Sequence, residues 1–299
     1  MNVLEISGLR KRFGSKQALD DVTLRVPENC VFGVVGRNGA GKTTTMKSIV
    51  GLLKPDDGKI TVCGEPVSYG SGRTNRFIGY LPDVPEFYGY MTAREYMSLC
   101  GRVAGMKSSD IKSRTDELLE LVGLADEKHR VKGYSRGMKQ RLGIAQALIS
   151  RPKLLICDEP TSALDPVGRR EILDILKDAG KQTSVFFSTH ILTDVERICD
   201  RVAFLEGGRI ALSGSIEEIR RMRGNTSVEI QPENPSDTAA IAEQFPDGEI
   251  TDGCFLLKNA SADDAERLMQ FLLQHHIAVI RFERKEPDLE DMFMEVIGT

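Results

Sequence analysis

The chain has 299 residues, enough for a domain with a sizeable hydrophobic core and a second, smaller domain. Its 40 lysines and arginines are outnumbered by 44 aspartates and glutamates, so the formal net charge is −4 and we expect no nucleic-acid partner. No apolar run approaches the roughly 20 residues that a membrane-spanning helix requires.

The cysteines and the first residues indicate a cytosolic protein. The six cysteines are dispersed, and several lie in apolar runs, as Cys157 does, which is typical of reduced core thiols. The start, Met1–Glu5, lacks the charged residues and apolar centre of a secretory signal. Because the four histidines form no zinc set with the cysteines, we expect no metal other than a nucleotide-bound cation.

The amino-terminal part predicts a strand, a glycine-rich loop and a helix in succession. Two short strands, Val3–Ile6 and Val22–Val26, precede a buried strand at Val31–Val35, which is apolar, β-branched and bounded by glycine. The loop Gly36–Thr43 fits the pattern G-x-x-x-x-G-K-[ST], and a helix is expected over Thr43–Leu53 before a Pro-Asp-Asp-Gly run. This order is the context that a nucleoside triphosphate-binding loop requires.

The loop carries the residue types that phosphate binding needs. Gly36, Gly39 and Gly41 let the backbone approach phosphates without Cβ clashes, and the helix N-terminus that follows favours anions. Lys42 is expected to neutralise the β- and γ-phosphates, and the Thr43 hydroxyl to ligate Mg²⁺. Further candidate contacts to the nucleotide are Asn38, Ala40 and Thr44.

A second strand ends in two carboxylates. The apolar run Leu154–Cys157 leads into Asp158 and Glu159, and strand C-termini of an open α/β sheet face the ligand crevice. We expect Asp158 to approach Mg²⁺ and Glu159 to polarise the attacking water, as general base or positioning residue. An ordinary capping turn could hold the same two residues, but the upstream loop favours the catalytic interpretation.

The remaining elements of this half follow from periodicity and capping. Residues 92–124 are expected to be helical, starting with the capping-box residues Thr92 and Glu95. A helix over residues 165–180 precedes a buried strand at Ser184–Phe187. Glu206–Arg209 predicts a hairpin turn, and a short helix follows Ser215.

The segment Tyr134–Gln140 resembles the signature motif of ATP-binding cassette (ABC) ATPases, and residues 1–223 resemble an ABC nucleotide-binding domain with its motifs in the family's order. The resemblance implies an α/β P-loop ATPase domain with a RecA-like core, an antiparallel β subdomain and an α-helical subdomain. It implies ATP and Mg²⁺ as ligands. It also implies a shared site in which Ser135 and Gly137 of one subunit contact the nucleotide held by the other.

Three more positions match the family's motifs. Phe13 lies where the family places an aromatic ring against adenine, although a plain core phenylalanine is the alternative. Asp165 matches the loop that communicates across the dimer, and it also suits a helix N-cap before Pro166. His190 matches the switch histidine that contacts the γ-phosphate, so it joins Lys42 and Glu159 as a catalytic candidate.

The sequence departs from the family at two places. Asp83 stands where the family usually has glutamine, and we expect it to keep the role of Mg²⁺ ligand with altered reach. In the signature, Arg136 and Met138 replace a usual glycine and glutamine, and Arg136 adds a cation near the partner's phosphate. The same segment begins an amphipathic helix that runs through Leu148, and the two interpretations are compatible.

Three aromatic residues and one proline lie between Asp83 and the predicted helical part: Pro85, Phe87, Tyr88 and Tyr90. In related transporters this neighbourhood receives a short helix of the membrane subunit. An exposed aromatic cluster suits such a groove, and internal packing of the rings is the alternative.

Residues 224–299 predict a small α+β domain after a short linker. Strands alternate with helices: Ser227–Ile230, Cys254–Leu257 and Ala278–Phe282 are expected strands, and Ala262–Gln274 and Leu289–Val296 expected helices. The tail Glu286–Phe293 is similar to the tails of ABC-2-type exporter ATPases, including bacitracin- and multidrug-resistance subtypes. A regulatory or dimer-supporting role and a spacer role both stay open.

The resemblance implies an ATP-hydrolysing subunit of an ABC transporter, and the tail implies one that is ABC-2-type and exports its cargo. Its expected partners are a second ATPase subunit, identical or related, and integral membrane permease subunits, which places it in the cytoplasm on the inner face of the cell membrane. A soluble ABC ATPase of translation or DNA repair is the alternative. The motifs between Tyr134 and His190 argue against a P-loop kinase or GTPase. Because Asp83 departs from the usual glutamine, a binding module that does not hydrolyse ATP is a further alternative.

Overall fold

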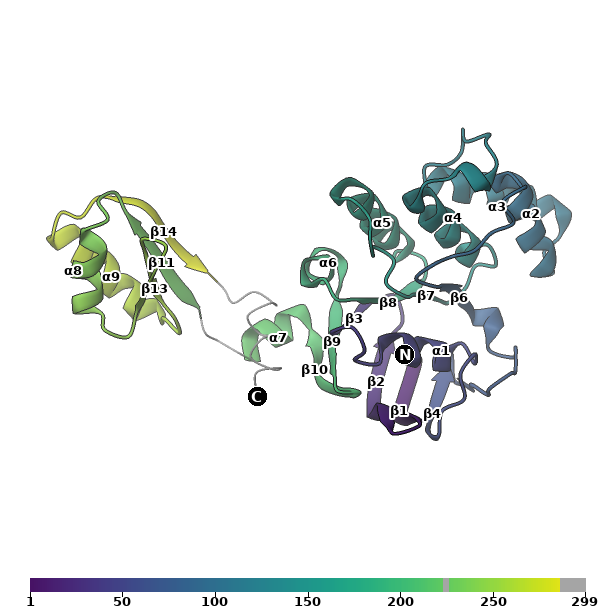
Figure 1. Ribbon diagram of the computed structural model, residues 1–299, viewed down its shortest axis with the longest axis horizontal. Coiled ribbons are helices and arrows are strands. Elements are labelled where there is room, and N and C mark those ends of the chain that lie inside the picture. The colour runs from purple at the N-terminus through teal and green to yellow at the C-terminus, as the bar shows by residue number, and fades with distance from the viewer. Residues whose placement is uncertain (223–225, 286–299) are drawn as a thin grey trace. The chain divides into compact units, whose positions relative to one another are not determined.

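The computed structural model describes residues 1–222 and 226–285, with the side chains of residues 221 and 222 left aside. The chain separates into two compact units, Met1–Ile216 and Glu217–Thr299, which are described one at a time (Figure 1). The domain boundary expected between residues 223 and 224 stays a prediction. In the described part of the chain, no helix has the length and apolar character needed to cross a bilayer.

The first unit begins with a four-stranded antiparallel sheet in the order β2-β1-β4-β5. Its strands are β1 (Asn2–Phe13), β2 (Lys16–Pro27), β4 (Asp57–Val62) and β5 (Glu65–Pro66). The two strands predicted here lie inside β1 and β2, which extend further because their alternation of buried and exposed side chains continues towards a tight hairpin. There Phe13 pairs with Lys16, so the turn carries Phe13 to the end of the sheet.

A six-stranded sheet in the order β10-β9-β3-β8-β7-β6 forms the centre of the first unit. Its strands are β3 (Val31–Val35), β6 (Ile78–Leu81), β7 (Leu154–Cys157), β8 (Ser184–Thr189), β9 (Arg201–Glu206) and β10 (Arg209–Ser215). All but β10 pair in parallel, and β3, β7 and β8 are buried along their whole length, as continuous apolar runs require. The carboxyl ends of β3, β6, β7 and β8 therefore meet at one edge.

Helices pack around this sheet, and those between β6 and β7 gather in one group (Figure 1). They are α1 (Lys42–Ile49), α2 (Ala93–Val103), α3 (Ser108–Leu121), α4 (Arg136–Leu148), α5 (Pro166–Ala179) and α6 (Leu192–Ile198). The Thr92–Glu95 capping box is present at the start of α2. Two expected helices were too long: α1 stops before Gly51, and residues 92–124 break into α2 and α3 at Gly105, because both glycines take positive φ.

The helix α4 lies directly against β6. A Cβ on Gly79 would come within 2.1 Å of the Ala147 carbonyl oxygen, so only glycine permits this approach of strand and helix. This contact joins the start of β6 to the carboxyl-terminal part of α4, while a Cβ on Gly143 would come within 2.5 Å of Leu81 at the end of β6. The amino-terminal turn of α4 and the end of β6 reappear at the site described below.

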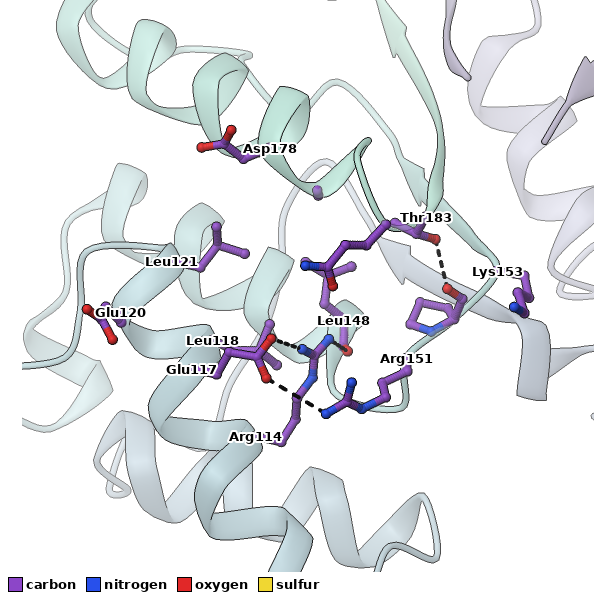
Figure 2. A pocket seen from close by; sticks show the side chains of 13 residues that line it. Arg114, Glu117, Leu118, Glu120, Leu121, Leu148, Arg151, Lys153, Asp178 and Thr183 are labelled. Atoms are coloured by element: carbon purple, nitrogen blue, oxygen red, sulfur yellow. Dashed lines mark hydrogen bonds and ion pairs between the residues drawn. The ribbon is translucent and has the colours of Figure 1, made fainter. Parts of the chain in front are cut away.

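A buried arginine joins α3 to the far end of α4. Arg114 donates to the Leu148 carbonyl oxygen over 2.9 Å and to Glu117 over 2.5 Å, and Figure 2 shows its guanidinium between these two acceptors. Leu148 ends α4, so its carbonyl has no partner within the helix. Arg151 reaches the same Glu117 over 3.9 Å but is largely exposed. The Arg151 backbone N–H also donates to the Leu148 carbonyl, over 3.1 Å, so Arg114 supplies its second donor and ties α3 to the end of α4.

Arg114→Ala is expected to lower the free energy of unfolding of the first unit by about 1–3 kcal/mol, because the Leu148 carbonyl keeps only the Arg151 N–H and loses its charged donor in a buried place. Arg151→Ala is the matched control, with an expected change below about 0.5 kcal/mol because its ion pair is solvated. Denaturant titration of both variants checks this. Equal losses would show that the buried carbonyl contact contributes nothing beyond a surface charge pair.

In its described residues, the second unit contains one sheet and the helices α7, α8 and α9. After α7 (Ile216–Met222) come β11 (Ser227–Pro232), α8 (Asp237–Gln244), β12 (Glu249–Thr251), β13 (Cys254–Leu257), α9 (Ala262–Gln274) and β14 (Val279–Lys285). The strands are antiparallel in the order β12-β13-β11-β14, and this βαββαβ succession is the ferredoxin-like arrangement.

The predicted α+β character of this unit is visible in its core, where Val228, Ile230 and Phe255 of the sheet pack with Ile241 and Leu268 of the helices. The sequence analysis missed α8 and β12. The helix expected at Leu289–Val296 and the tail Glu286–Phe293 lie outside the described residues.

Candidate nucleotide-binding site

The glycine-rich loop wraps its own backbone around the Lys42 ammonium. The loop connects β3 to α1, and Lys42, the first residue of α1, is 6 % exposed. Its Nζ donates to the Gly36 carbonyl over 2.6 Å and to the Arg37 carbonyl over 3.2 Å. A buried ammonium needs such acceptors because its desolvation is costly. The cation is thus held in place at the amino end of α1, where anions are favoured.

Lys42 also reaches the catalytic candidates at the end of β7. Its Nζ lies 3.1 Å from Glu159 Oε1, and Glu159 Oε2 lies 2.9 Å from His190 Nδ1. The three predicted catalytic residues therefore form one chain of contacts from three separate segments. Glu159 has φ 47, a left-handed conformation that is uncommon for a non-glycine residue and occurs often at functional sites.

Ser188 fixes the two carboxylates, and the sequence analysis did not find it. Its hydroxyl donates to Asp158 Oδ1 over 2.8 Å and accepts from the Glu159 backbone N–H over 2.9 Å. Asp158 itself is buried, and its N–H donates to the Leu81 carbonyl of β6. The one sequence signal was a serine inside the apolar strand β8, where an unpaired hydroxyl would be unfavourable.

Most of the predicted residues line one pocket of about 400 Å³. It contains these predicted residues: Phe13, Asn38, Gly39, Gly41, Lys42, Thr43, Thr44, Asp83, Glu159 and His190. The structure adds Lys16, Ala18 and Ser162 to the lining. Phe13 is 50 % exposed, so the alternative that it is a core phenylalanine is wrong. A pocket of this size with an aromatic ring at one side and a cation at the other suits a nucleotide.

The oxygen donors expected for Mg²⁺ fit that ion. Thr43 and Asp83 line the pocket, and Asp158 is buried at the adjoining strand end. Hydroxyl, carboxylate and phosphate oxygens are the ligands that Mg²⁺ prefers. Within residues 1–222 and 226–285 no group of three or more His, Cys, Asp or Glu is placed to hold a metal by itself.

Asp83 is the member of this donor set whose Oδ1 atom lacks a hydrogen-bond partner among the described residues. Its Oδ1 is buried without a hydrogen-bond donor, and the nearest cation is Arg136, whose Nη2 lies 3.5 Å away. Burial raises the pKa of Asp83, the Arg136 charge opposes that rise, and the charges of Asp158 and Glu159 add to it. A carboxylate in this position gains from any further cation.

Of the remaining predicted contacts, Gly36 and Ala40 belong to the loop but do not line the pocket, and the other three lie at helix starts, also outside its lining. Ser135 caps α4, with its hydroxyl accepting from the Met138 N–H over 3.2 Å, and Gly137 lies in the first turn of that helix. Asp165 caps α5 in the same way, accepting from the Gly168 N–H over 2.9 Å. Both helices thus begin where the sequence predicts, with their first N–H groups partly satisfied.

A second pocket, of about 430 Å³, adjoins the site. We call it the aromatic groove; its lining includes Pro85, Phe87, Arg136 and Gln140. Beside it Tyr88 and Tyr90 are 55 % and 63 % exposed, so the alternative that these rings pack inside is wrong for both. Phe87 is half-buried against Tyr96. The pocket of Figure 2, by contrast, is lined in part by the residues that come just before β7 and β8 in the chain. None of the predicted site residues lines it.

Comparison with known proteins identifies the family. Residues 19–162 match the ABC transporter family model, and residues 214–297 match the model of the C-terminal domain of DrrA1-3-like ATP-binding proteins. The chain is 38 % identical to the ABC transporter ATP-binding protein YxlF of Bacillus subtilis, over 99 % of each chain. The chain belongs to the ABC transporter ATP-binding subunits.

Two further relatives agree. The bacitracin transport ATP-binding protein BcrA of Bacillus licheniformis is 33 % identical, with 99 % of this chain and 97 % of BcrA covered. A solved ATP-binding subunit of an ABC transporter superposes with a TM-score of 0.67 at 32 % identity, over 74 % of this chain and 92 % of that one.

These matches confirm the predicted family, the ABC ATPase fold with its accessory domain, and the ATPase activity of an ABC transporter subunit. ABC ATPase subunits bind ATP and work as dimers with membrane subunits. The alternative of a soluble factor in translation or DNA repair is not favoured. The roles assigned to single residues stay predictions.

Glu159→Gln is expected to bind nucleotide at least about fivefold more tightly, because the triphosphate no longer competes with a carboxylate for Lys42. Hydrolysis is expected to fall by about 100-fold or more if Glu159 acts as general base. Titration with nucleotide at protein concentrations where light scattering shows monomers measures the first effect. Glu171→Gln is the control, because Glu171 lies on α5 and pairs with Arg141 of α4. Weaker binding by Glu159→Gln would contradict the competition.

Proposed function

We propose that this chain is the ATPase subunit of an ABC-2-type exporter. Two copies bind two ATP molecules between them, and closure of the dimer drives separate permease subunits. The observation that carries the proposal is the chain of contacts from Lys42 through Glu159 to His190 inside the pocket that Phe13 borders. In our assignment Lys42 holds the β- and γ-phosphates, Glu159 polarises the attacking water and His190 contacts the γ-phosphate.

Mg²⁺ would be held by Thr43, Asp83 and Asp158 together with phosphate oxygens, where it neutralises charge on the phosphates. Ser188 supports this arrangement by holding Asp158 and the Glu159 backbone at fixed positions. The protein's own part is thus to orient the phosphates and to place one carboxylate beside the water.

Two predicted nucleotide contacts that do not line the pocket of their own chain support a dimer. Ser135 and Gly137 carry donors at the start of α4, yet neither lines the pocket of their own chain. Backbone N–H groups at a helix start favour phosphate, so these donors suit the nucleotide of a second copy. Each ATP would then contact both chains, which makes ATP bind the closed dimer better than the open one.

The aromatic groove supports a permease partner. Val84, Tyr88 and Tyr90 expose large apolar side chains next to Asp83, which itself lines the nucleotide pocket. Exposed aromatic residues are enriched in protein interfaces. We assign this surface to a short helix of the membrane subunit, which would place the chain in the cytoplasm, bound peripherally to the inner face of the membrane.

Export as the direction of transport is supported by the relatives. BcrA is named for bacitracin transport, and the second unit matches the DrrA1-3-like C-terminal domain. The cargo belongs to the chemistry of the permease and is left open.

The shared site is tested by complementation in a Glu159→Gln background, where ATP with Mg²⁺ is expected to give dimers by size exclusion with light scattering. Gly137→Asp should abolish them, because its charge faces the partner's phosphates. The nearest atom to a Cβ there is Leu164 Cδ2 at 3.8 Å, so the fold accommodates the change. Lys42→Ala should also abolish them by removing nucleotide.

An equal mixture of the Gly137→Asp and Lys42→Ala chains should regain dimers, since one Lys42 site then meets one intact signature helix. Monomers in that mixture, or dimers of Gly137→Asp alone, would refute a site shared between two chains.

Purification from native membranes in mild detergent is expected to bring a polytopic membrane protein with the chain. Tyr90→Arg should reduce the recovered partner by about tenfold, because large aromatic side chains often dominate interface energies. Val103→Arg, at an 82 % exposed valine of α2, is the control and should leave recovery unchanged. Equal recovery with both variants would place the permease elsewhere.

A further inference from the structure

Asp83 belongs to two pockets at once. It lines the nucleotide pocket with Thr43 and Glu159, and it lines the aromatic groove with Arg136 and Gln140. Its backbone is fixed, because buried Gln140 donates from Nε2 to the Asp83 carbonyl oxygen over 2.7 Å. Rotation about the Cα–Cβ bond would turn the carboxylate from one pocket towards the other while the backbone stays in place.

In the structure the carboxylate faces Arg136. The Oδ1–Nη2 distance is 3.5 Å, and both side chains are 46 % exposed, so the pair is weak and partly solvated. Arg136 is the first residue of α4, between the cap Ser135 and Gly137. An arginine here stands beside the N–H groups that a phosphate of the second chain would meet, and a guanidinium binds phosphate through paired hydrogen bonds.

The two possible partners of Asp83 compete for its charge. A carboxylate that ligates Mg²⁺ at about 2.1 Å gives most of its charge to the metal, and it cannot also hold a guanidinium on its other side with the same strength. Asp158 and Glu159 lie at the same edge and make the region more negative, which favours the metal. Arg136 loses its partner as the metal gains one.

We propose that the Asp83–Arg136 ion pair is a latch: it is closed in the nucleotide-free chain, and Mg²⁺ with nucleotide opens it by taking Asp83, which releases Arg136 for the phosphates held by the second chain. The proposal rests on the proposed function, since it requires the shared site. It makes Arg136 a positioning residue of dimer closure, and it links a filled site in one chain to the readiness of that chain's signature helix.

The latch gives Arg136→Gln two effects of opposite sign. Without the competing guanidinium, Asp83 takes the metal more readily, so the Mg²⁺ concentration for half-maximal nucleotide binding should fall by about two- to fivefold. Without the cation for the partner's phosphate, the dimer should dissociate at least about tenfold more readily. A structural defect in α4 would weaken both. The split in sign is therefore the diagnostic result.

The experiment uses the full chain with Glu159→Gln throughout. Mg²⁺ is titrated at fixed ATP with protein held at monomeric concentration, and the dimer constant is measured by sedimentation at saturating Mg²⁺. Arg141→Gln is the matched control, because Arg141 lies on the same helix and pairs with Glu171 over 3.4 Å, away from both pockets. It should change neither constant.

Asp83→Asn in the same background completes a double-mutant cycle with Arg136→Gln. Asp83→Asn should raise the Mg²⁺ concentration needed for half-maximal nucleotide binding. Because Arg136 then has no ion-pair partner, it should still stabilise the dimer, and the dimer constant should show that stabilisation. Both effects of Arg136→Gln having the same sign, or neither differing from Arg141→Gln, would overturn the latch while the dimer itself persists. If the parent Glu159→Gln chain forms no ATP-dependent dimer, the shared site fails, and with it the proposed function.

Discussion

The arrangement of the site depends on one buried cation. Lys42 is almost inaccessible to solvent, and its ammonium is compensated by two loop carbonyls and by Glu159. A buried charge without such partners would be strongly destabilising. The compensation requires the end of β7 to lie beside the loop after β3, and the parallel sheet with β8 between them provides that placement. The fold itself therefore brings Lys42, Glu159 and His190 together, and the phosphates of a bound nucleotide would compete with these partners for the Lys42 ammonium.

The sequence was informative wherever one segment carries its own signal. β3, β7 and the start of α5 follow from apolar runs and an Asp-Pro cap, because burial and capping are local in sequence. The break between α2 and α3 was not predicted, since apolar spacing continues across Gly105. Ser188 was not predicted either, because its role depends on Asp158 and Glu159, which only the pairing of β7 with β8 brings close.

The same limit applies to the two departures from the family's usual residues. Asp83 and Arg136 were considered separately, since nothing in the sequence relates the end of β6 to the start of α4. The structure brings them together because α4 packs against the end of β6, where Gly143 lies against Leu81 and Gln140 donates to the Asp83 carbonyl. Asp83 alone would add a third carboxylate beside Asp158 and Glu159, and Arg136 offsets that charge. The two departures are thus one electrostatic change shared by two segments.

That change has a mechanical consequence, because Asp83 is held by α4 at two points. Gln140 holds its carbonyl oxygen and Arg136 lies 3.5 Å from its carboxylate, so a tilt of α4 would move Asp83 relative to Thr43. Arg136 and Gln140 also line the aromatic groove, so a partner seated there would act on the position that we propose as a Mg²⁺ ligand. Linkage is reciprocal for binding free energies. If the groove's occupant changes the affinity for Mg²⁺ and nucleotide, the nucleotide must change the affinity for the occupant by the same factor, which is the coupling that a transporter needs between its ATPase and its permease.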